Sequence, residues 1–139
     1  MNYLLDTNIC IALINGKPPA VRVRVEKEIR AGSGLFVSSV SLYELWYGVS
    51  KSRDVEPNTK RLAAFLAGPI SILSFAEEDA PLAGQLRAST ERAGRPIGSY
   101  DLLLAAQALR RKLIFVTANR REFSRVAGLK WQNWAPSLS

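Results

Sequence analysis

Hydrophobic positions along the chain fall into two kinds of segment. In the first kind, a few neighbouring residues are mostly apolar, which is typical of short buried strands. In the second kind, apolar side chains recur every three or four positions, as they do on one face of a helix. The first pattern predicts strands at 2–6, 34–39, 70–75 and 113–117, and a final strand at 129–134. The second predicts helices at 7–16, 20–31, 40–52, 59–67, 77–94 and 98–112, and a short helix at 121–127.

The segment 20–31 also has features of a strand, because Val21, Val23 and Val25 alternate with charged residues. Its second half separates Val25 from Ile29 by four positions, and a Gly-Ser-Gly sequence follows closely, so we predict a helix. A polar loop is expected at 53–58.

Strands and helices alternate along the whole sequence, with intervening lengths suited to crossover connections. This order predicts an α/β fold around a mainly parallel sheet. The 139 residues contain no internal repeat, low-complexity segment or interdomain linker, so we expect a single domain over 1–139.

The composition narrows the possible functions. Nineteen Lys and Arg against twelve Asp and Glu give a formal net charge of +7, which favours association with nucleic acid. The absence of His excludes a His general base, a Ser-His-Asp triad and a His-ligated zinc site. The single cysteine, Cys10, cannot form an internal disulfide, and no apolar run approaches the roughly 20 residues that cross a membrane. We therefore expect a cytoplasmic protein without a membrane partner.

Three of the twelve carboxylates stand in unexpected places. Asp6 ends an apolar strand, Glu44 interrupts an apolar helix, and Asp101 opens the strongly apolar helix at 98–112. The other nine lie among basic residues, in loops or near helix ends, and are expected to be solvated: Glu26, Glu28, Asp54, Glu56, Glu77, Glu78, Asp79, Glu91 and Glu122.

Each of the three unusual acids needs a partner, because an unpaired buried carboxylate is costly. For one acid alone, helix capping by Asp6 or Asp101, or an ion pair of Glu44 with an arginine, is an equally good explanation. Parallel strands deliver their carboxyl ends to one edge of the sheet, where ligands bind, and both aspartates can face that edge. Carboxylates that converge there require a cation, and oxygen ligands without His or Cys suit Mg²⁺ or Mn²⁺. An acidic pocket in a basic protein indicates a metal-dependent nuclease.

Two other classes of function share parts of this pattern. A catalytically weak nucleic-acid-binding α/β domain would have the same basic charge. A Rossmann-type nucleotide binder would have the same alternation, but the close glycine pair, Gly32 and Gly34, precedes a predicted strand instead of following one. A phosphatase with Asp6 as nucleophile is a third possibility, but the DTN segment lacks a second nearby acid to serve as acid or base.

The chain resembles PIN-domain ribonucleases, and specifically the VapC toxins of bacterial toxin–antitoxin pairs, in four segments: LLDTN, SSVSLYELWYGV, RPIGSYDLLLAAQAL and FVTANRREFSRVAGLKWQNW. The resemblance implies a three-layer α/β/α sandwich with a mainly parallel sheet. It implies endonucleolytic cleavage of RNA, often a structured RNA such as tRNA, with Mg²⁺ or Mn²⁺ as cofactor and 5′-phosphate and 3′-hydroxyl products. It also implies a homodimer and inhibition by a cognate VapB-type antitoxin in a higher hetero-oligomer.

The resemblance assigns the metal site residue by residue. Asp6, Glu44 and Asp101 correspond to the three central acids of the family. Many members have aspartate at the fourth acidic position, where this chain has Asn119, followed by Glu122 three residues later. Either Asn119 contributes a neutral oxygen, or Glu122 reaches the ion, or one metal suffices. We expect a strong first metal site and a weak or substrate-dependent second.

Neighbouring polar residues are expected to support the acids. Thr7 and Asn8 are predicted to cap the first helix and to orient Asp6. Ser99 is predicted to cap the helix that follows it, and Thr117 to approach Asp6 from the adjacent strand. For Asn8 and Ser99, plain capping without a role in the site is an equally good explanation.

Several aromatic residues have two possible roles. Trp131 and Trp134 are candidates for stacking on RNA bases, with packing in the core or at a sheet edge as the default expectation. Leu45, Trp46 and Tyr47 are candidates for contact with a second protomer or an antitoxin, again with core packing as the default.

Overall fold

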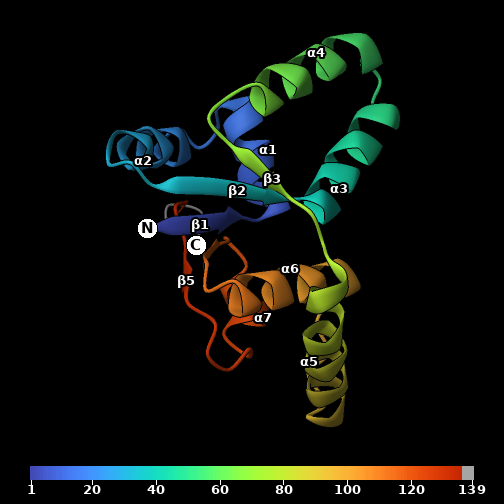
Figure 1. Ribbon diagram of the computed structural model, residues 1–139. Helices are drawn as coiled ribbons and strands as arrows, with labels where there is room; N and C mark the ends of the chain where they lie inside the picture. Colours follow the sequence, from blue (N-terminus) through green and yellow to red (C-terminus); the bar gives the residue numbers. More distant parts are fainter. Residues whose placement is uncertain (136–139) are drawn as a thin grey trace.

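Five parallel strands form the central sheet in the computed structural model, which describes residues 1–135 (Figure 1). The order across the sheet is β3-β2-β1-β4-β5, and Tyr3 of β1 is in register with Leu35 of β2 and Ile114 of β4. The expected parallel sheet is therefore confirmed. Its strands are β1 (Asn2–Leu5), β2 (Gly34–Ser38), β3 (Ser71–Leu73), β4 (Ile114–Val116) and β5 (Trp131–Gln132).

Helices cover both faces of the sheet (Figure 1). One face carries α1 (Thr7–Asn15), α2 (Pro19–Arg30), α3 (Ser39–Ser50) and α4 (Val55–Leu66). The other carries the 3₁₀ turn η1 (Glu77–Asp79) and the helices α5 (Ala80–Arg92), α6 (Ser99–Arg110) and α7 (Arg120–Phe123). This is the expected α/β/α sandwich. Within residues 1–135, none of the helices combines the length and apolar character needed to cross a bilayer.

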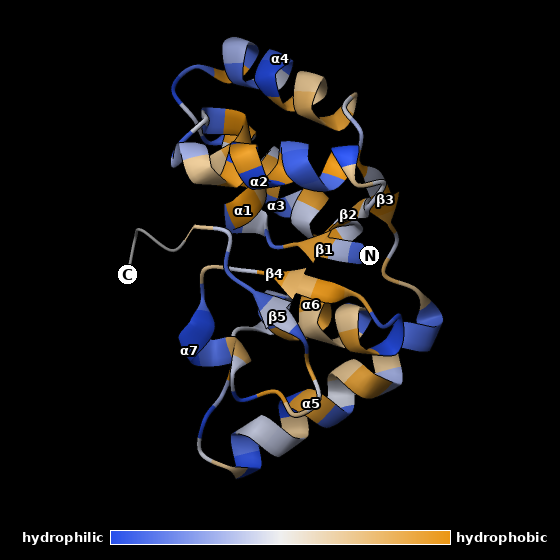
Figure 2. Cartoon of the chain, turned by 90° about the vertical axis from the view of Figure 1, so that its left-hand side faces the viewer, coloured by the Kyte–Doolittle hydropathy of each residue, from blue (hydrophilic) through white to orange (hydrophobic). Residues whose placement is uncertain are grey.

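Each face of the sheet has its own hydrophobic core, because successive side chains of a strand point to opposite faces. In β1, Tyr3 and Leu5 pack with residues of α1 and α2, whereas Leu4 packs with Phe115 and with residues of α6. Figure 2 shows hydrophobic residues concentrated on the central strands, while α7 is mostly hydrophilic. Since both faces are buried, the strands appear in the sequence as continuous apolar runs.

The predicted helix at 20–31 is confirmed as α2. Val21 and Val25 are buried, whereas Val23 is 63% exposed. The buried face of the helix therefore follows the spacing of four positions and not the alternation of valines with charged residues. The predicted loop at 53–58 is wrong from Val55 onward, where α4 begins. Pro57 lies in the first turn of α4, where its missing N–H would have no partner within the helix. The elements β3, β5 and α7 are shorter than predicted.

Two acids that were expected to be solvated are buried. Asp79 is fully buried and forms ion pairs with Arg110 and Arg111 at the end of α6. Burial raises the pKa of Asp79, but the Ala76 N–H and the two guanidinium groups outweigh that effect, so the pKa lies below its usual value. Glu28 is also buried and accepts from Arg24 and Ser33. The arginines that pair with Asp79 lie more than thirty positions away in the sequence, so local patterns did not reveal them.

Candidate active site

The candidate site lies where the order of the strands reverses. From β1 the chain builds outward to β2 and β3, and then crosses to β4 on the other side of β1. Connections thus leave β1 and β4 in opposite directions, which opens a crevice at their carboxyl ends, the usual place for a ligand in such sheets. Asp6 directly follows β1 and Thr117 directly follows β4.

Asp6 is held from the adjacent strand, as predicted for Thr117. The Thr117 hydroxyl donates to Asp6 Oδ2 at 2.8 Å, and the Asn119 N–H donates to the same hydroxyl oxygen at 2.9 Å. Asp6 is only 3% exposed. Burial raises the pKa of Asp6, the Thr117 hydrogen bond opposes this rise, and the negative charge of Glu44 adds to it.

Glu44 is held by the first helix. Thr7 Oγ1 donates to Glu44 Oε1 at 2.7 Å and lies 2.8 Å from Ser41 Oγ. Because the single Thr7 hydroxyl hydrogen is used on the carboxylate, the Ser41 hydroxyl donates to Thr7. The Thr7 side chain therefore orients Glu44, whereas the backbone N–H groups of Thr7 and Asn8 donate to Asp6 and lower the pKa of that carboxyl.

Asp101 is the third residue of α6 and lies close to the negative charges of the other acids. Burial and the neighbouring charge of Asp6 raise the pKa of Asp101 to about 7, and contacts with Glu122 and the charge of Glu44 add to the shift. The predicted cap of this helix is wrong, because Gly98 occupies the N-cap position and Ser99 is an exposed first helical residue.

Helix capping and ion pairing account only in part for the three acids in the described residues. Asp6 occupies the N-cap position of α1, where the Thr7 and Asn8 N–H groups lower its pKa, but its side chain makes no full capping hydrogen bond; Thr7 and Asn8 are helical residues and not caps. Asp101 lies inside its helix, and Glu44 has no ion pair with an arginine among residues 1–135.

The segment after β4 separates the roles of Asn119 and Glu122. Asn119 is the N-cap of α7, and its Oδ1 accepts from the Glu122 N–H at 3.4 Å. Glu122 Oε2 is buried and has no hydrogen-bond partner within residues 1–135. Glu122 was expected to be solvated, because arginines precede it. Its contact with Asp101 instead turns it toward the acidic residues.

Asp6, Glu44 and Asp101 line one cleft of about 470 Å³, so the three acids singled out in the sequence lie together. Asn8 lines it as well. Tyr100 and Lys51 also line this cleft and were missed in the sequence, as was Tyr43. Their positions gave a weak signal, because Tyr43 and Tyr100 each directly precede one of the acids.

The donor set suits a hard divalent cation. The polar side chains around the cleft offer carboxylate and hydroxyl oxygens, and three negative charges raise the pKa of Asp101. The buried Oε2 of Glu122 has no hydrogen-bond partner among the described residues, and a bound cation would serve as its partner. In residues 1–135 no group of three Asp, Glu or Cys side chains is already close enough together to hold a metal ion. The carboxylates therefore share a cleft but do not form a complete coordination site.

The described aromatic residues divide between core and surface. Trp134 is buried, packs edge-on against Tyr3 at 5.0 Å and lies beneath Arg24, so base stacking by Trp134 is wrong. Trp131 is half-buried against the core. In α3, Leu45 is buried as expected by default, whereas Trp46 and Tyr47 are 40% and 57% exposed.

Comparisons with known proteins give one consistent result. A family model described as "PIN domain" matches residues 3–129. The "tRNA(fMet)-specific endonuclease VapC" of Shigella flexneri is 42% identical over 97% of this chain and 99% of its own length. "Ribonuclease VapC2" of Rickettsia felis is 38% identical over 96% and 98%.

Solved structures give the same result. VapBC2 from Rickettsia felis, bound to a DNA fragment from its promoter, contains a chain that is 37% identical and superposes with a TM-score of 0.90, over 96% of this chain and 99% of that one. A chain of the DNA-bound VapBC of Salmonella typhimurium is 36% identical and has a TM-score of 0.87, over 96% and 98%.

Proposed function

Since the chain belongs to the PIN-domain family, and within it to the VapC ribonucleases of toxin–antitoxin systems, we propose that it is a metal-dependent endoribonuclease toxin. Its substrate is a structured RNA such as a tRNA, in line with the name of the Shigella flexneri relative. The observation that carries the proposal is the meeting of Asp6, Glu44 and Asp101 in one cleft at the reversal of strand order. Residues 1–139 act as a single PIN domain.

The cofactor in this proposal is Mg²⁺, with Mn²⁺ as the alternative. Asp6, Glu44 and Asp101 would hold the ion, and Glu122, more than Asn119, would complete the acidic set. When bound, the cation activates water and neutralises negative charge at the scissile phosphate.

The residues behind the carboxylates hold them in place before the ligand arrives. Thr117 fixes one oxygen of Asp6, and Thr7 fixes one oxygen of Glu44. Such outer contacts reduce the reorganisation that binding requires. Below about pH 7 the Asp101 carboxyl, whose pKa is about 7, carries a proton that it releases as the ligand binds. In the hydrolysis, a water oxygen bonds to phosphorus while the bond to the 3′ oxygen breaks, and that oxygen takes up a proton.

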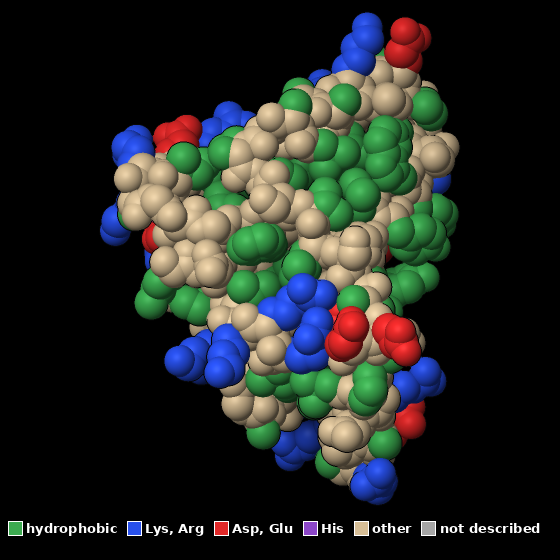
Figure 3. All heavy atoms as spheres, viewed as in Figure 1, with side chains coloured by type: hydrophobic (Ala, Val, Ile, Leu, Met, Phe, Trp, Pro, Cys, Tyr) green, Lys and Arg blue, Asp and Glu red, His purple; other side chains and the backbone are tan. Residues whose placement is uncertain are grey.

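The proposed partners are RNA, a second copy of the chain and a VapB-type antitoxin, the last two in a higher hetero-oligomer in the cytoplasm. VapBC complexes among the similar structures support the antitoxin. A groove of about 220 Å³ beside the cleft, lined mainly by apolar residues of α1, α3 and α4 together with Asn15, Glu44 and Asn58, also supports a protein partner. Figure 3 shows hydrophobic side chains gathered over α3 and α4, with Lys and Arg spread around the rest of this face, over α2, at the tip of α4 and across the lower half.

The test is incubation of antitoxin-free protein with total RNA in Mg²⁺, Mn²⁺ or a chelator, followed by mapping of the new ends. We expect cleavage only with a divalent cation, with 5′-phosphate ends. Cleavage that continues in chelator would refute the metal-dependent mechanism. Tight RNA binding without cleavage in either metal would support the alternative, a catalytically weak nucleic-acid-binding domain, which Asn119 at the fourth acidic position favours.

Glu122→Gln is expected to weaken Mn²⁺ binding and to slow RNA cleavage by about 10- to 100-fold, because it removes a partly buried charge beside Asp101. Asn119→Ala removes a neutral oxygen that already serves the Glu122 N–H, so both quantities should change by less than about threefold. Calorimetric Mn²⁺ titration and single-turnover cleavage measure the two effects. The reverse ranking would assign the fourth position to Asn119.

Thr7→Val is expected to lower metal affinity about tenfold, because the Glu44 carboxylate loses the hydroxyl that orients it. Thr7→Ser keeps the hydroxyl and is the matched control, with an affinity close to that of the unchanged protein. Equal affinities for the valine and serine variants would show that the contact between Thr7 and Glu44 does not support the site.

A further inference from the structure

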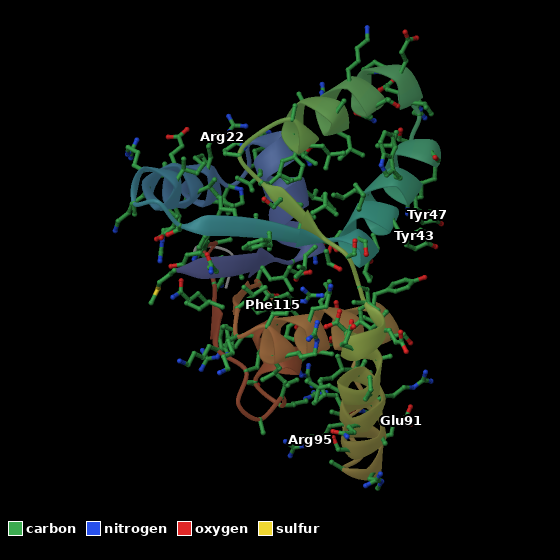
Figure 4. The ribbon with its side chains drawn as sticks, in the orientation of Figure 1. Arg22, Tyr43, Tyr47, Glu91, Arg95 and Phe115 are labelled. Carbon is green, nitrogen blue, oxygen red and sulfur yellow. The ribbon has the colours of Figure 1, made fainter. Side chains whose placement is uncertain are left out.

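Three exposed tyrosines line the cleft beside the carboxylates. Tyr43 and Tyr47 belong to α3 and are 55% and 57% exposed, and Tyr100 of α6 is 45% exposed. Figure 4 labels Tyr43 and Tyr47 at the outer side of α3, away from the sheet. These large aromatic surfaces contribute little to the core, so their place at the cleft needs another explanation.

Tyr43 and Tyr100 form an ordered pair across the mouth of the cleft. Their ring centroids are 5.7 Å apart and the ring planes meet at 61°, an edge-to-face arrangement. Tyr43 directly precedes Glu44 and Tyr100 directly precedes Asp101. In an edge-to-face pair, the ring that contributes its edge keeps both faces available. The pair therefore offers a flat aromatic surface next to the proposed cleavage site.

Lys51 adds a positive charge to the same surface. Its Nζ lies 4.9 Å from the centre of the Tyr47 ring, a cation–π contact that holds the ammonium group at the cleft. Lys51 is the one Lys or Arg among the described residues that line this cleft. One RNA strand could occupy all three features. Its base would lie on the aromatic surface, a flanking phosphate would contact the ammonium group, and the scissile phosphate would lie at the acidic pocket.

We propose that Tyr43, Tyr100 and Lys51 form a nucleotide subsite, in which an unpaired base stacks on the tyrosine pair and the ammonium group contacts a flanking phosphate. The subsite requires an unpaired nucleotide, because a paired base is already stacked within its helix and offers no free face. This inference rests on the proposed ribonuclease function, and it makes the tyrosines positioning residues that select the nucleotide beside the cut.

The position of the tyrosine pair favours RNA over a protein partner on this surface. The tyrosine pair is continuous with the acidic cleft and with Lys51, whereas the neighbouring groove on α1, α3 and α4 is mainly apolar. A strand whose phosphate reaches Asp6 and Asp101 enters the same cleft that these rings line, so a neighbouring base lies within reach of them.

The test measures binding of a stem-loop RNA that carries 2-aminopurine at one loop position. The protein carries Asp6→Asn in every sample, so that the RNA stays intact. Tyr43→Ala and Tyr100→Ala are each expected to weaken binding about tenfold and to reduce the quenching of 2-aminopurine by stacking. Tyr43→Phe and Tyr100→Phe keep the ring and should bind normally. Trp46→Ala removes an exposed aromatic of α3 that does not line the cleft and is the matched control.

Unchanged affinity and quenching in both alanine variants would overturn the subsite, as would equal losses in the Trp46 control. Loss of the dimer or of antitoxin binding, with unchanged RNA affinity, would instead assign the tyrosines to a protein interface. With Asp6 intact, the alanine variants should raise KM more than they lower kcat. If the unchanged protein cleaves no RNA in either metal but still quenches 2-aminopurine through the tyrosines, the proposed function fails and the subsite stands.

Discussion

Asp6→Asn is expected to lower the rate of RNA cleavage about 10³-fold, which corresponds to about 4 kcal/mol of transition-state stabilisation. Asp6 is the most buried of the three central acids, and the substitution removes its negative charge from the proposed metal site. The fold should persist, because the asparagine oxygen can still accept from the Thr117 hydroxyl. Single-turnover cleavage with Mg²⁺ and thermal unfolding without divalent cations measure the two effects.

The matched control for this charge change is Glu91→Gln. Glu91 lies on α5, far from α3 in Figure 4, and pairs only with the exposed Arg87 among the described residues. Its activity should equal that of the unchanged protein. The midpoint of unfolding should rise on addition of Mn²⁺ in the Glu91 variant but not in the Asp6 variant. An Asp6 variant that retains cleavage within a few fold would refute the role of Asp6.

Asp101→Asn is expected to change activity and stability in opposite directions. Cleavage should fall by about 10³-fold, while the metal-free protein should gain on the order of 2 kcal/mol at pH 8, after allowance for solvent access to the carboxyl group. The gain arises because burial and the neighbouring acids penalise the ionised form of Asp101, whose pKa is about 7 in the folded protein. Sites that serve a ligand commonly cost stability in this way.

The pH dependence of unfolding tests the same point. Between about pH 7 and the usual aspartate pKa near 4, the folded protein binds one more proton at Asp101 than the unfolded chain does. The free energy of unfolding should therefore rise as the pH falls through 7, in the absence of divalent cations. This contribution should disappear in the Asp101→Asn variant. An identical pH profile for the two proteins between pH 5 and 8 would contradict the raised pKa.

The sequence patterns located most of the helices and strands, because side-chain periodicity is a local property. The boundaries failed where local signals conflicted, as at Val55, where a polar segment with a proline begins a helix and not a loop. The unusual acids were found by the same means, since Asp6, Glu44 and Asp101 each interrupt or flank an apolar pattern.

The partners of these acids depend on the folded chain. Thr117 lies 111 positions from Asp6, and Thr7 lies 37 positions from Glu44. Only the parallel pairing of β1 with β4, and the packing of α1 against α3, bring these groups together. The sequence linked Thr7 only to its neighbour Asp6, because local patterns do not show that the Thr7 side chain reaches Glu44.

By itself, then, the sequence determined the α/β alternation, the basic charge, the absence of histidine chemistry and the three acids, because each depends on residue type and local spacing. Only the tertiary structure decided that Glu122 turns toward Asp101 while Asn119 caps α7, that Asp79 is buried among arginines, and that Tyr43 meets Tyr100. The physical reason is that burial, ion pairing and ring contact depend on distance in space, and the crossover connections of the sheet set that distance.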